Sequence, residues 1–98
     1  MARLNWTELS INDLTNIAEF ISKDSFKYAT IQIKRIRERA RILKTKPFLG
    51  RIVPEIQDDS IRELILGNYR IIYKIVSKDR IDILTVHHSA KLLKMELL

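Results

Sequence analysis

The stretch IRELILGNYRIIYKIVSKDRIDILTVHH, residues 61–88, is the most informative part of this 98-residue chain. Its residues alternate between apolar and polar and are rich in β-branched and aromatic types, which is typical of strands that bury one face. The dipeptides Gly67-Asn68 and Lys78-Asp79 interrupt the alternation and suit two-residue hairpin turns. The stretch therefore predicts a three-stranded antiparallel meander.

Two-residue turns would also set the register between these strands. One sheet face then carries the core side chains, with Tyr73 opposite Leu84: Leu64, Leu66, Tyr69, Ile71, Tyr73, Leu84 and Val86. The other face carries polar side chains: Glu63, Arg70, Lys74, Thr85 and His87.

Arg70 is the residue that this register explains. Burying an unpaired guanidinium is costly, and the register places Arg70 on the polar face, across from His87 and diagonal to Glu63. One interpretation is a cross-strand charge network that keeps an exposed sheet face in water. On such a face we expect a substitution of Arg70 to leave the fold intact.

The residues before this region follow a helical period instead. Ser10 and Asp13 have the spacing of a capping box, and Asp24 or Ser25 can cap a second helix, which the PFLG segment at residues 47–50 ends. The two apolar stripes are Leu14, Ile17, Ala18 and Ile21, and Ala29, Ile33, Ile36, Ala40 and Leu43. Since each stripe needs a partner, the pattern predicts an antiparallel helical hairpin.

The remaining segments complete an α+β fold. ARLNWT at residues 2–7 is typical of a further strand, and SAKLLKMELL predicts a short helix that begins near Ser89. A chain of this length supports one core, so residues 1–98 are expected to form a single domain. We predict an N-terminal strand and a helical hairpin packed on an antiparallel β-meander sheet, with a short C-terminal helix.

The composition argues against a metal site and a disulfide framework. The chain has no cysteine, and its two histidines are adjacent, without metal-ligand spacing. We therefore expect no metal and no cofactor. No apolar run approaches the roughly 20 residues of a membrane span, and the N-terminus lacks the apolar core of a signal peptide. These features favour a cytoplasmic location.

Basic residues concentrate in the second predicted helix. The net charge is +6, and seven of the thirteen residues from 34 to 46 are basic, against one acidic residue, Glu38. Such a run is often only a solvated face. However, like charges four residues apart, such as Arg35 and Arg39, destabilise a helix. The pattern therefore favours an anionic partner, either nucleic acid or an acidic protein.

Nearly the whole chain resembles a known family. The resemblance is carried by WTELSINDLTNIAEFI at residues 6–21, PFLGR at 47–51, VPE at 53–55, IRELILGNYRIIYKI at 61–75 and ILTVHHSAK at 83–91. In this order the segments resemble the RelE/ParE superfamily of toxins from bacterial type II toxin–antitoxin modules. Its members follow two unrelated mechanisms on one fold.

The first mechanism is ribosome-dependent, metal-free cleavage of messenger RNA, in which a ribose 2′-hydroxyl attacks the adjacent phosphate. The resemblance implies that Arg70 would stabilise the phosphate, that Glu55 would act as base, and that His87 or His88 would act as acid or base. Candidate RNA contacts are Arg62, Lys74, Lys91, Arg37, Arg41 and Lys44. The chain departs from this pattern because it lacks the tyrosine that many such nucleases carry after the last strand.

The second mechanism belongs to the ParE branch, which binds and poisons DNA gyrase without catalytic residues of its own. The segments RELILGNYRIIYKI and VHHSAK resemble this branch at least as closely. We therefore predict a ParE-like toxin that inhibits growth by binding DNA gyrase. The RNA endonuclease and an inactive relative that only binds an antitoxin are the alternatives.

The resemblance also implies an antitoxin partner, which we expect to be an acidic, partly disordered segment that folds on the toxin. Ile31 and Ile42 lie off the core stripe of the second helix, beside basic residues, and Leu93 and Leu97 belong to an apolar C-terminal segment. These four residues are the candidate antitoxin contacts.

Overall fold

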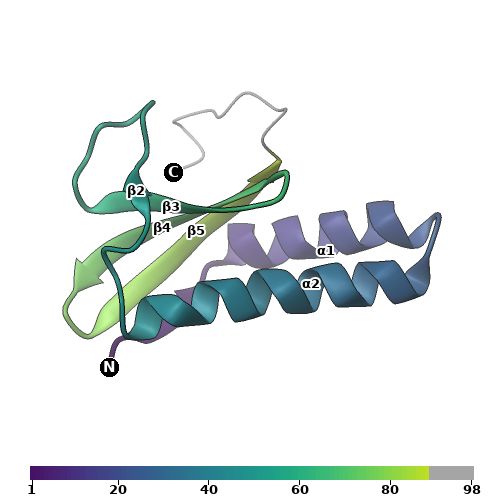
Figure 1. Ribbon diagram of the computed structural model, residues 1–98, viewed down its shortest axis with the longest axis horizontal. Coiled ribbons are helices and arrows are strands. Elements are labelled where there is room, and N and C mark those ends of the chain that lie inside the picture. The colour runs from purple at the N-terminus through teal and green to yellow at the C-terminus, as the bar shows by residue number, and fades with distance from the viewer. Residues whose placement is uncertain (89–98) are drawn as a thin grey trace.

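The computed structural model describes residues 1–88, so the predicted helix from Ser89 and the candidates Lys91, Leu93 and Leu97 lie outside the described residues. Within them the elements follow the predicted order (Figure 1): β1 (Arg3–Trp6), α1 (Glu8–Ser22), α2 (Phe26–Arg41), the 3₁₀ helix η1 (Ile42–Lys44), β2 (Arg51–Ile52), β3 (Ile61–Leu66), β4 (Tyr69–Ser77) and β5 (Arg80–His88). The predicted α+β class is confirmed.

The strands form one mixed five-stranded sheet in the order β1-β5-β4-β3-β2. Strands β3, β4 and β5 form the predicted antiparallel meander, and both of its turns contain two residues. β1 pairs with β5 in parallel, which the long connection through the helices and the other three strands permits. β2 pairs with β3 at the other end of the sheet, and no local pattern predicted this short strand.

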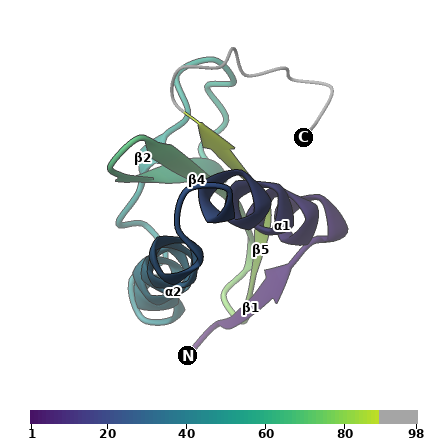
Figure 2. The same cartoon turned by 90° about the vertical axis from the view of Figure 1, so that its right-hand side faces the viewer.

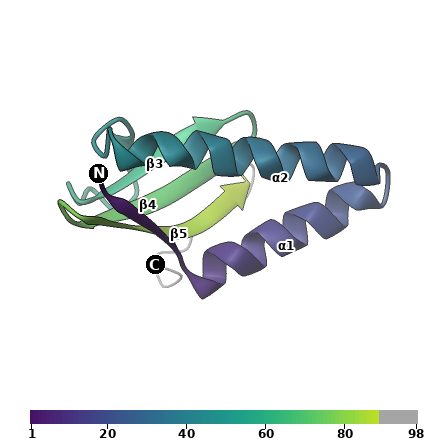
Figure 3. The same cartoon turned by 90° about the horizontal axis from the view of Figure 1, so that it is seen from below.

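The two helices form the predicted hairpin and cover one face of the sheet (Figures 2 and 3). Ile36, Ala40 and Leu43 of the second stripe are fully buried. They share one core with sheet residues from the same face: Leu64, Ile71, Tyr73, Ile81, Ile83 and Val86. The opposite face of the sheet is called the outer face below.

The cap of α1 differs from the prediction. Thr7 rather than Ser10 is the N-cap: its hydroxyl accepts from the Ser10 N–H at 3.2 Å and donates to the Ile83 carbonyl at 2.8 Å. β1 places Thr7 beside β5, so one hydroxyl serves both the helix and the sheet. Of the two predicted caps of α2, Asp24 and Ser25, the structure uses Ser25, whose hydroxyl accepts from the Tyr28 N–H at 3.0 Å.

Asp13, the predicted partner of Ser10, binds β5 instead. Its carboxylate accepts hydrogen bonds from the Val86 N–H at 3.0 Å and from the Thr85 hydroxyl. The pairing of β1 with β5 ends at Ile83. Beyond that point, the Asp13 side chain of α1 accepts the hydrogen bonds of β5.

Two β-bulges alter the register between β4 and β5. Near the turn Val76 is an extra residue of β4, and further along Leu84 is an extra residue of β5. Because the two extra residues lie on opposite strands, the shifts cancel. Arg70 therefore lies opposite His87, as predicted.

Between the bulges one predicted core position is wrong. Tyr73 pairs with Ile83 rather than with Leu84, and Ile81 and Ile83 fill the core beneath the helices. Leu84 faces the other way and packs near Ile72 on the outer face. Turn length alone could not reveal this, because a bulge changes the side-chain alternation without changing the turn.

The outer face carries a second, smaller apolar cluster. Val53 and Ile72 are fully buried, and Ile56, Ile61 and Leu84 pack around them. The chain between β2 and β3 supplies two of these residues and forms the loop that rises from β2 in Figure 1. Part of the face that was predicted to be polar is therefore apolar and covered.

Gly50 and Tyr73 join the loop before β2 to the sheet. The Tyr73 hydroxyl donates to the Pro47 carbonyl at 2.7 Å and accepts from the Gly50 N–H at 3.0 Å. A Cβ atom on Gly50 would lie 2.5 Å from the Glu63 carbonyl oxygen and 2.6 Å from the Tyr73 hydroxyl oxygen. The backbone at Gly50 thus approaches β3 too closely for any other residue.

We expect Gly50→Ala to lower the free energy of unfolding by about 1–3 kcal/mol, because the added methyl group forces the packed backbone apart. Gly67→Asn is the matched control, since Gly67 has a φ of 57° but open space where a Cβ would lie, and asparagine tolerates that conformation. Urea unfolding measures both variants. Equal losses in the two would refute the packing argument.

Candidate functional site

Four charged side chains form an ionic cluster on the outer face: Arg51, Glu55, Glu63 and Arg70. The Arg70 Nε donates to Glu63 Oε1 at 2.6 Å, and its Nη1 and Nη2 donate to the two Glu55 oxygens at 2.7 and 2.8 Å. The second Glu63 oxygen accepts from the Arg51 Nε at 2.5 Å. Charge-assisted hydrogen bonds thus link β2, the loop after it, β3 and β4.

The strand register explains why these side chains meet. Arg51 lies opposite Glu63 across β2 and β3, and Glu63 is diagonal to Arg70 across β3 and β4. Glu55 approaches Arg70 from the loop after β2. Sequence analysis placed Arg70 near Glu63 but missed Arg51, because the strand that carries Arg51 has no local signature.

Glu63 and Arg70, at the centre of the ionic cluster, are buried rather than exposed. Arg70 is only 9% exposed, and the Glu63 side chain is completely covered. The predicted charge network exists, but its predicted exposure is wrong, and with it the reason for expecting that a substitution of Arg70 leaves the fold intact. The cause is the loop after β2, since Val53 and Ile56 pack on the sheet and bring Glu55 over Arg70.

Arg70 controls the protonation of Glu55. Its side-chain hydrogen bonds lower the pKa of Glu55 to about 2, although burial acts in the opposite direction. The same hydrogen bonds to Glu55, followed by the one to Glu63, raise the pKa of Arg70 above its ordinary value. Both partners are therefore charged at neutral pH, and a carboxylate with so low a pKa is a poor general base.

The two histidines lie on different faces at the end of β5. His87 is opposite Arg70 in the strand register. The His88 ring meets the Tyr69 ring edge-on, with 5.4 Å between their centroids, and faces α1. The structure therefore brings one of the two candidate acid–base residues to the ionic cluster and directs the other toward the helices.

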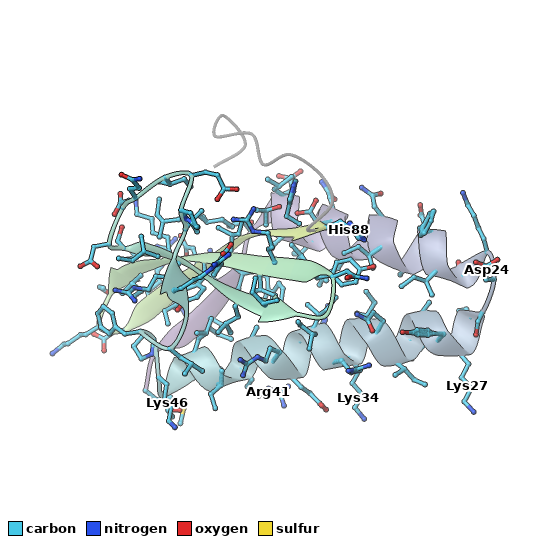
Figure 4. All side chains as sticks on the ribbon, turned by 45° about the horizontal axis from the view of Figure 1, so that its top comes forward. Asp24, Lys27, Lys34, Arg41, Lys46 and His88 are labelled. Atoms are coloured by element: carbon cyan, nitrogen blue, oxygen red, sulfur yellow. The ribbon has the colours of Figure 1, made fainter. Side chains whose placement is uncertain are left out.

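The basic candidates of the second helix lie away from the ionic cluster. In Figure 4 Lys34 and Arg41 point from α2 away from the sheet. Arg37 and Arg41 line a groove of about 670 Å³ between α1 and α2, and Ile33 contributes an apolar side chain to the same groove. Lys44 follows in η1. The structure thus groups these cations on the helical layer, separate from Arg70.

The two basic candidates on the strands, Arg62 and Lys74, differ in how far their side chains are exposed. The Arg62 Nη1 donates to the Gly50 carbonyl and its Nε to the Asp59 carbonyl, both at 3.0 Å, and its guanidinium lies 5.0 Å from the centre of the Phe48 ring. Lys74 is exposed on the outer face. Arg62 therefore holds two loops in place, whereas Lys74 faces solvent.

The two antitoxin candidates within the described residues lie at the surface. Ile31 is exposed on α2, and Ile42 is exposed at the start of η1. Ile31 lies in the first half of α2, and Ile42 directly follows the end of that helix. A single partner that contacts both residues therefore has to extend along α2.

No three histidine, aspartate or glutamate side chains among residues 1–88 are grouped so that they could hold a metal ion. The helices in this part of the chain also lack the length and apolar character needed to cross a membrane.

This chain is similar to the model of a protein family and to a solved structure. The family model, described as "ParE toxin of type II toxin-antitoxin system, parDE", matches residues 4–93. The solved structure, "Chromosomal ParDE TA system from P. aeruginosa", has a TM-score of 0.75 and 22% sequence identity, over 90% of this chain and 96% of that chain. At that identity the likeness concerns the fold. No curated protein matches the chain.

We expect Arg70→Ala to lower the free energy of unfolding by about 3–5 kcal/mol, because it leaves the buried Glu63 carboxylate with less compensation. Arg51→Ala is the matched control. It removes the other arginine of Glu63, but the Arg51 side chain is 62% exposed, so water can take its place at the carboxylate and its loss should cost less, about 1–2 kcal/mol. Denaturant unfolding measures both. An Arg70→Ala variant as stable as Arg51→Ala would exclude this role for Arg70.

Acid should weaken the contribution of Glu55 to stability. The pKa of Glu55 is about 2 in the folded chain, below its ordinary value of 4.5, so its contribution is present above about 4.5 and lost as the pH falls through about 2. Unfolding of the wild type and of Glu55→Gln is compared across this range. We expect the difference between them to shrink on acidification, and a difference that does not change with pH would disprove the pairing.

Proposed function

Because the chain belongs to the ParE toxin family of type II toxin–antitoxin systems, we propose that it inhibits growth by binding DNA gyrase. Such systems pair a toxin with an antitoxin, so an antitoxin partner comes with the family. The observation that carries the choice of target is the bonding of Arg70 to Glu55 within the ionic cluster.

The two groups that RNA cleavage would need are bound to each other. Arg70 donates from Nε and from both Nη atoms to carboxylates, so a phosphate would have to displace Glu55 and break a bidentate pair. Glu55, held at a pKa of about 2, would be a weak base for a 2′-hydroxyl. This arrangement supports a toxin that acts by binding a protein target rather than by catalysis.

RNA cleavage is the second candidate, because His87 lies opposite Arg70 on the outer face. An imidazole beside an arginine is a suitable pair for acid–base chemistry at a phosphate. For this function the loop that carries Glu55 would have to move away, so that Arg70 could bind a phosphate in its place. Lys74 on the same face would then add a contact to the RNA backbone.

For the antitoxin we propose contacts along α2. Ile31 and Ile42 offer exposed apolar side chains, and Lys34 and Arg35 offer positive charge between them. An acidic amphipathic segment would cover both kinds of surface and relieve the repulsion between neighbouring cations. Leu93 and Leu97, outside the described residues, are further candidates for this contact.

Induced expression should stop DNA synthesis before protein synthesis, because gyrase is the proposed target. Pulse labelling of both processes measures the order. With purified components, we expect the toxin to inhibit supercoiling by gyrase and to leave ribosome-bound messenger RNA intact. Early loss of protein synthesis together with cleaved messenger RNA would identify the nuclease instead.

The variant His87→Ala separates the two candidate functions, since it removes the imidazole that faces Arg70. A gyrase-binding toxin should keep its toxicity in this variant, whereas a nuclease should lose it. Lys78→Ala, at the exposed turn between β4 and β5, is the control, and circular dichroism verifies that both variants fold.

A further inference from the structure

The positive charge of the chain comes from one segment, which consists of α2, η1 and the two residues after η1. Residues 26–46 contain eight basic residues and one acidic residue, whereas the rest of the chain contains ten basic and eleven acidic residues. The eight are Lys27, Lys34, Arg35, Arg37, Arg39, Arg41, Lys44 and Lys46. So uneven a distribution of charge is typical of a surface that binds an anion.

The fold does not use the charge of this segment. The arginines that have carboxylate partners lie elsewhere: Arg51, Arg62, Arg70 and Arg80. None of the eight basic residues in 26–46 forms an ion pair with a carboxylate among residues 1–88. Six of the eight are exposed, and the other two, Arg39 and Lys44, are half-buried. Their charges are therefore available to a partner.

Three of the exposed cations lie in one straight line. Lys27, Lys34 and Arg41 are seven residues apart, close to two helical turns, so their side chains leave α2 in nearly the same direction. This line is about 21 Å long. Figure 4 shows all three pointing away from the sheet, with Lys46 pointing the same way beyond η1. These four residues are called the basic row below.

The stability of α2 does not explain the basic row. Lys27 is the second residue of the helix, where a positive charge opposes the helix dipole, and Lys34 lies in the middle, beyond the reach of either end. Only Arg41, in the last turn, is placed favourably. Arg37 lies three residues from Lys34 and four from Arg41, so it repels both. A bound anion would remove this repulsion.

The shape and composition of the row favour a double helix over a single strand. Each strand of duplex DNA carries one phosphate per about 3.4 Å of the axis, so a straight line of about 21 Å spans about six phosphates. Proteins that hold single strands use aromatic side chains on which the bases stack. Residues 29–46 contain no aromatic residue. The row therefore suits a regular phosphate backbone better than unpaired bases.

Two carboxylates limit where a polyanion can lie. Glu38 lies between Lys34 and Arg41 along α2, and it lines the groove between the helices together with Glu19 of α1. A phosphate backbone should therefore follow the outward side of α2 rather than enter this groove. For the same reason Glu38 should weaken the binding of a polyanion.

We propose that the basic row along α2 binds the backbone of double-stranded DNA without reading its sequence. Each of its four cations contacts a phosphate, and such contacts carry no sequence information. The choice of DNA rests on the proposed function, because DNA is the double helix on which gyrase acts. The binding is measured without gyrase, so its failure and the failure of the gyrase proposal are distinguishable. The row overlaps the proposed antitoxin contact at Lys34.

The probe is a fluorescent DNA duplex of about 20 base pairs, titrated with the full-length chain at about 50 to 200 mM salt and followed by anisotropy. With four phosphate contacts, the logarithm of the binding constant should fall with the logarithm of the salt concentration at a slope of about −3 to −4. A second duplex of unrelated sequence should bind within about threefold. Absence of binding at about 50 mM salt, a slope near zero or a sequence preference above about tenfold overturns the proposal.

Variants of the row separate a local contact from net charge. Lys34→Gln and Arg41→Gln should each weaken binding at least about fivefold at about 50 mM salt and make the slope shallower by about one. Lys78→Gln is the matched control, because it removes the same charge at the exposed turn between β4 and β5, and it should bind within about twofold of the wild type. Equal losses in all three variants overturn the row.

Two further variants test the charge of the row itself. Lys34→Arg keeps the charge and should bind the duplex within about threefold of the wild type. Glu38→Gln removes the carboxylate beside the row and should bind at least about twofold more tightly. A loss in Lys34→Arg as large as in Lys34→Gln, or unchanged affinity in Glu38→Gln, contradicts the phosphate contact.

Other anionic occupants give distinct results in competition with the labelled duplex. A single-stranded RNA and an RNA duplex of the same length should each compete at least about threefold more weakly than unlabelled DNA duplex. Vesicles of phosphatidylglycerol, at equal phosphate concentration, should not displace the duplex. Equal or stronger competition by either RNA assigns the row to RNA, and displacement by vesicles assigns it to a membrane surface. Both outcomes overturn the proposal.

Discussion

The carboxylate of Glu63, buried between two arginines, is the interaction on which the outer half of the molecule depends. A buried charge is tolerated only with partners of good geometry. Arg51 on β2 and Arg70 on β4 are those partners, so the carboxylate fixes β2 against β3 and ties β3 to β4. The remaining donors of Arg70 then require a second carboxylate, which Glu55 supplies from the loop after β2. One buried charge thereby organises three strands and the loop that covers them.

Most of the outer face is used to hold the fold together, so the proposed contacts with partner proteins have to use other surfaces. Val53 and Ile56 fill the apolar half of that face, and Glu55 closes over Arg70 in the other half. Further exposed surfaces lie on the basic flank of α2 and at the end of β3 that β2 does not cover. Both are suited to contacts with proteins: the first offers apolar side chains among cations, and the second offers backbone groups that no strand among residues 1–88 covers.

Local patterns predicted most elements, and the errors occurred where a distant partner competed. The turn at Gly67-Asn68 and the cap at Ser25 were predicted correctly, because each depends on residues within a few positions. Thr7 displaced Ser10 as the cap of α1, since β5 lies close enough to share its hydroxyl. Leu84 left the predicted core because two bulges reversed its direction and then restored the register beyond it.

The candidate site shows the same division between local and distant causes. The sequence by itself determined the helical and alternating periods, the basic second helix and the common face of Arg70 and Glu63, since these follow from spacings along short segments. Only the tertiary structure decided that Glu55 binds Arg70 and that Arg70 is buried. That outcome depends on how the loop after β2 packs on the sheet, and its energy comes from contacts across strands that no spacing in the chain records.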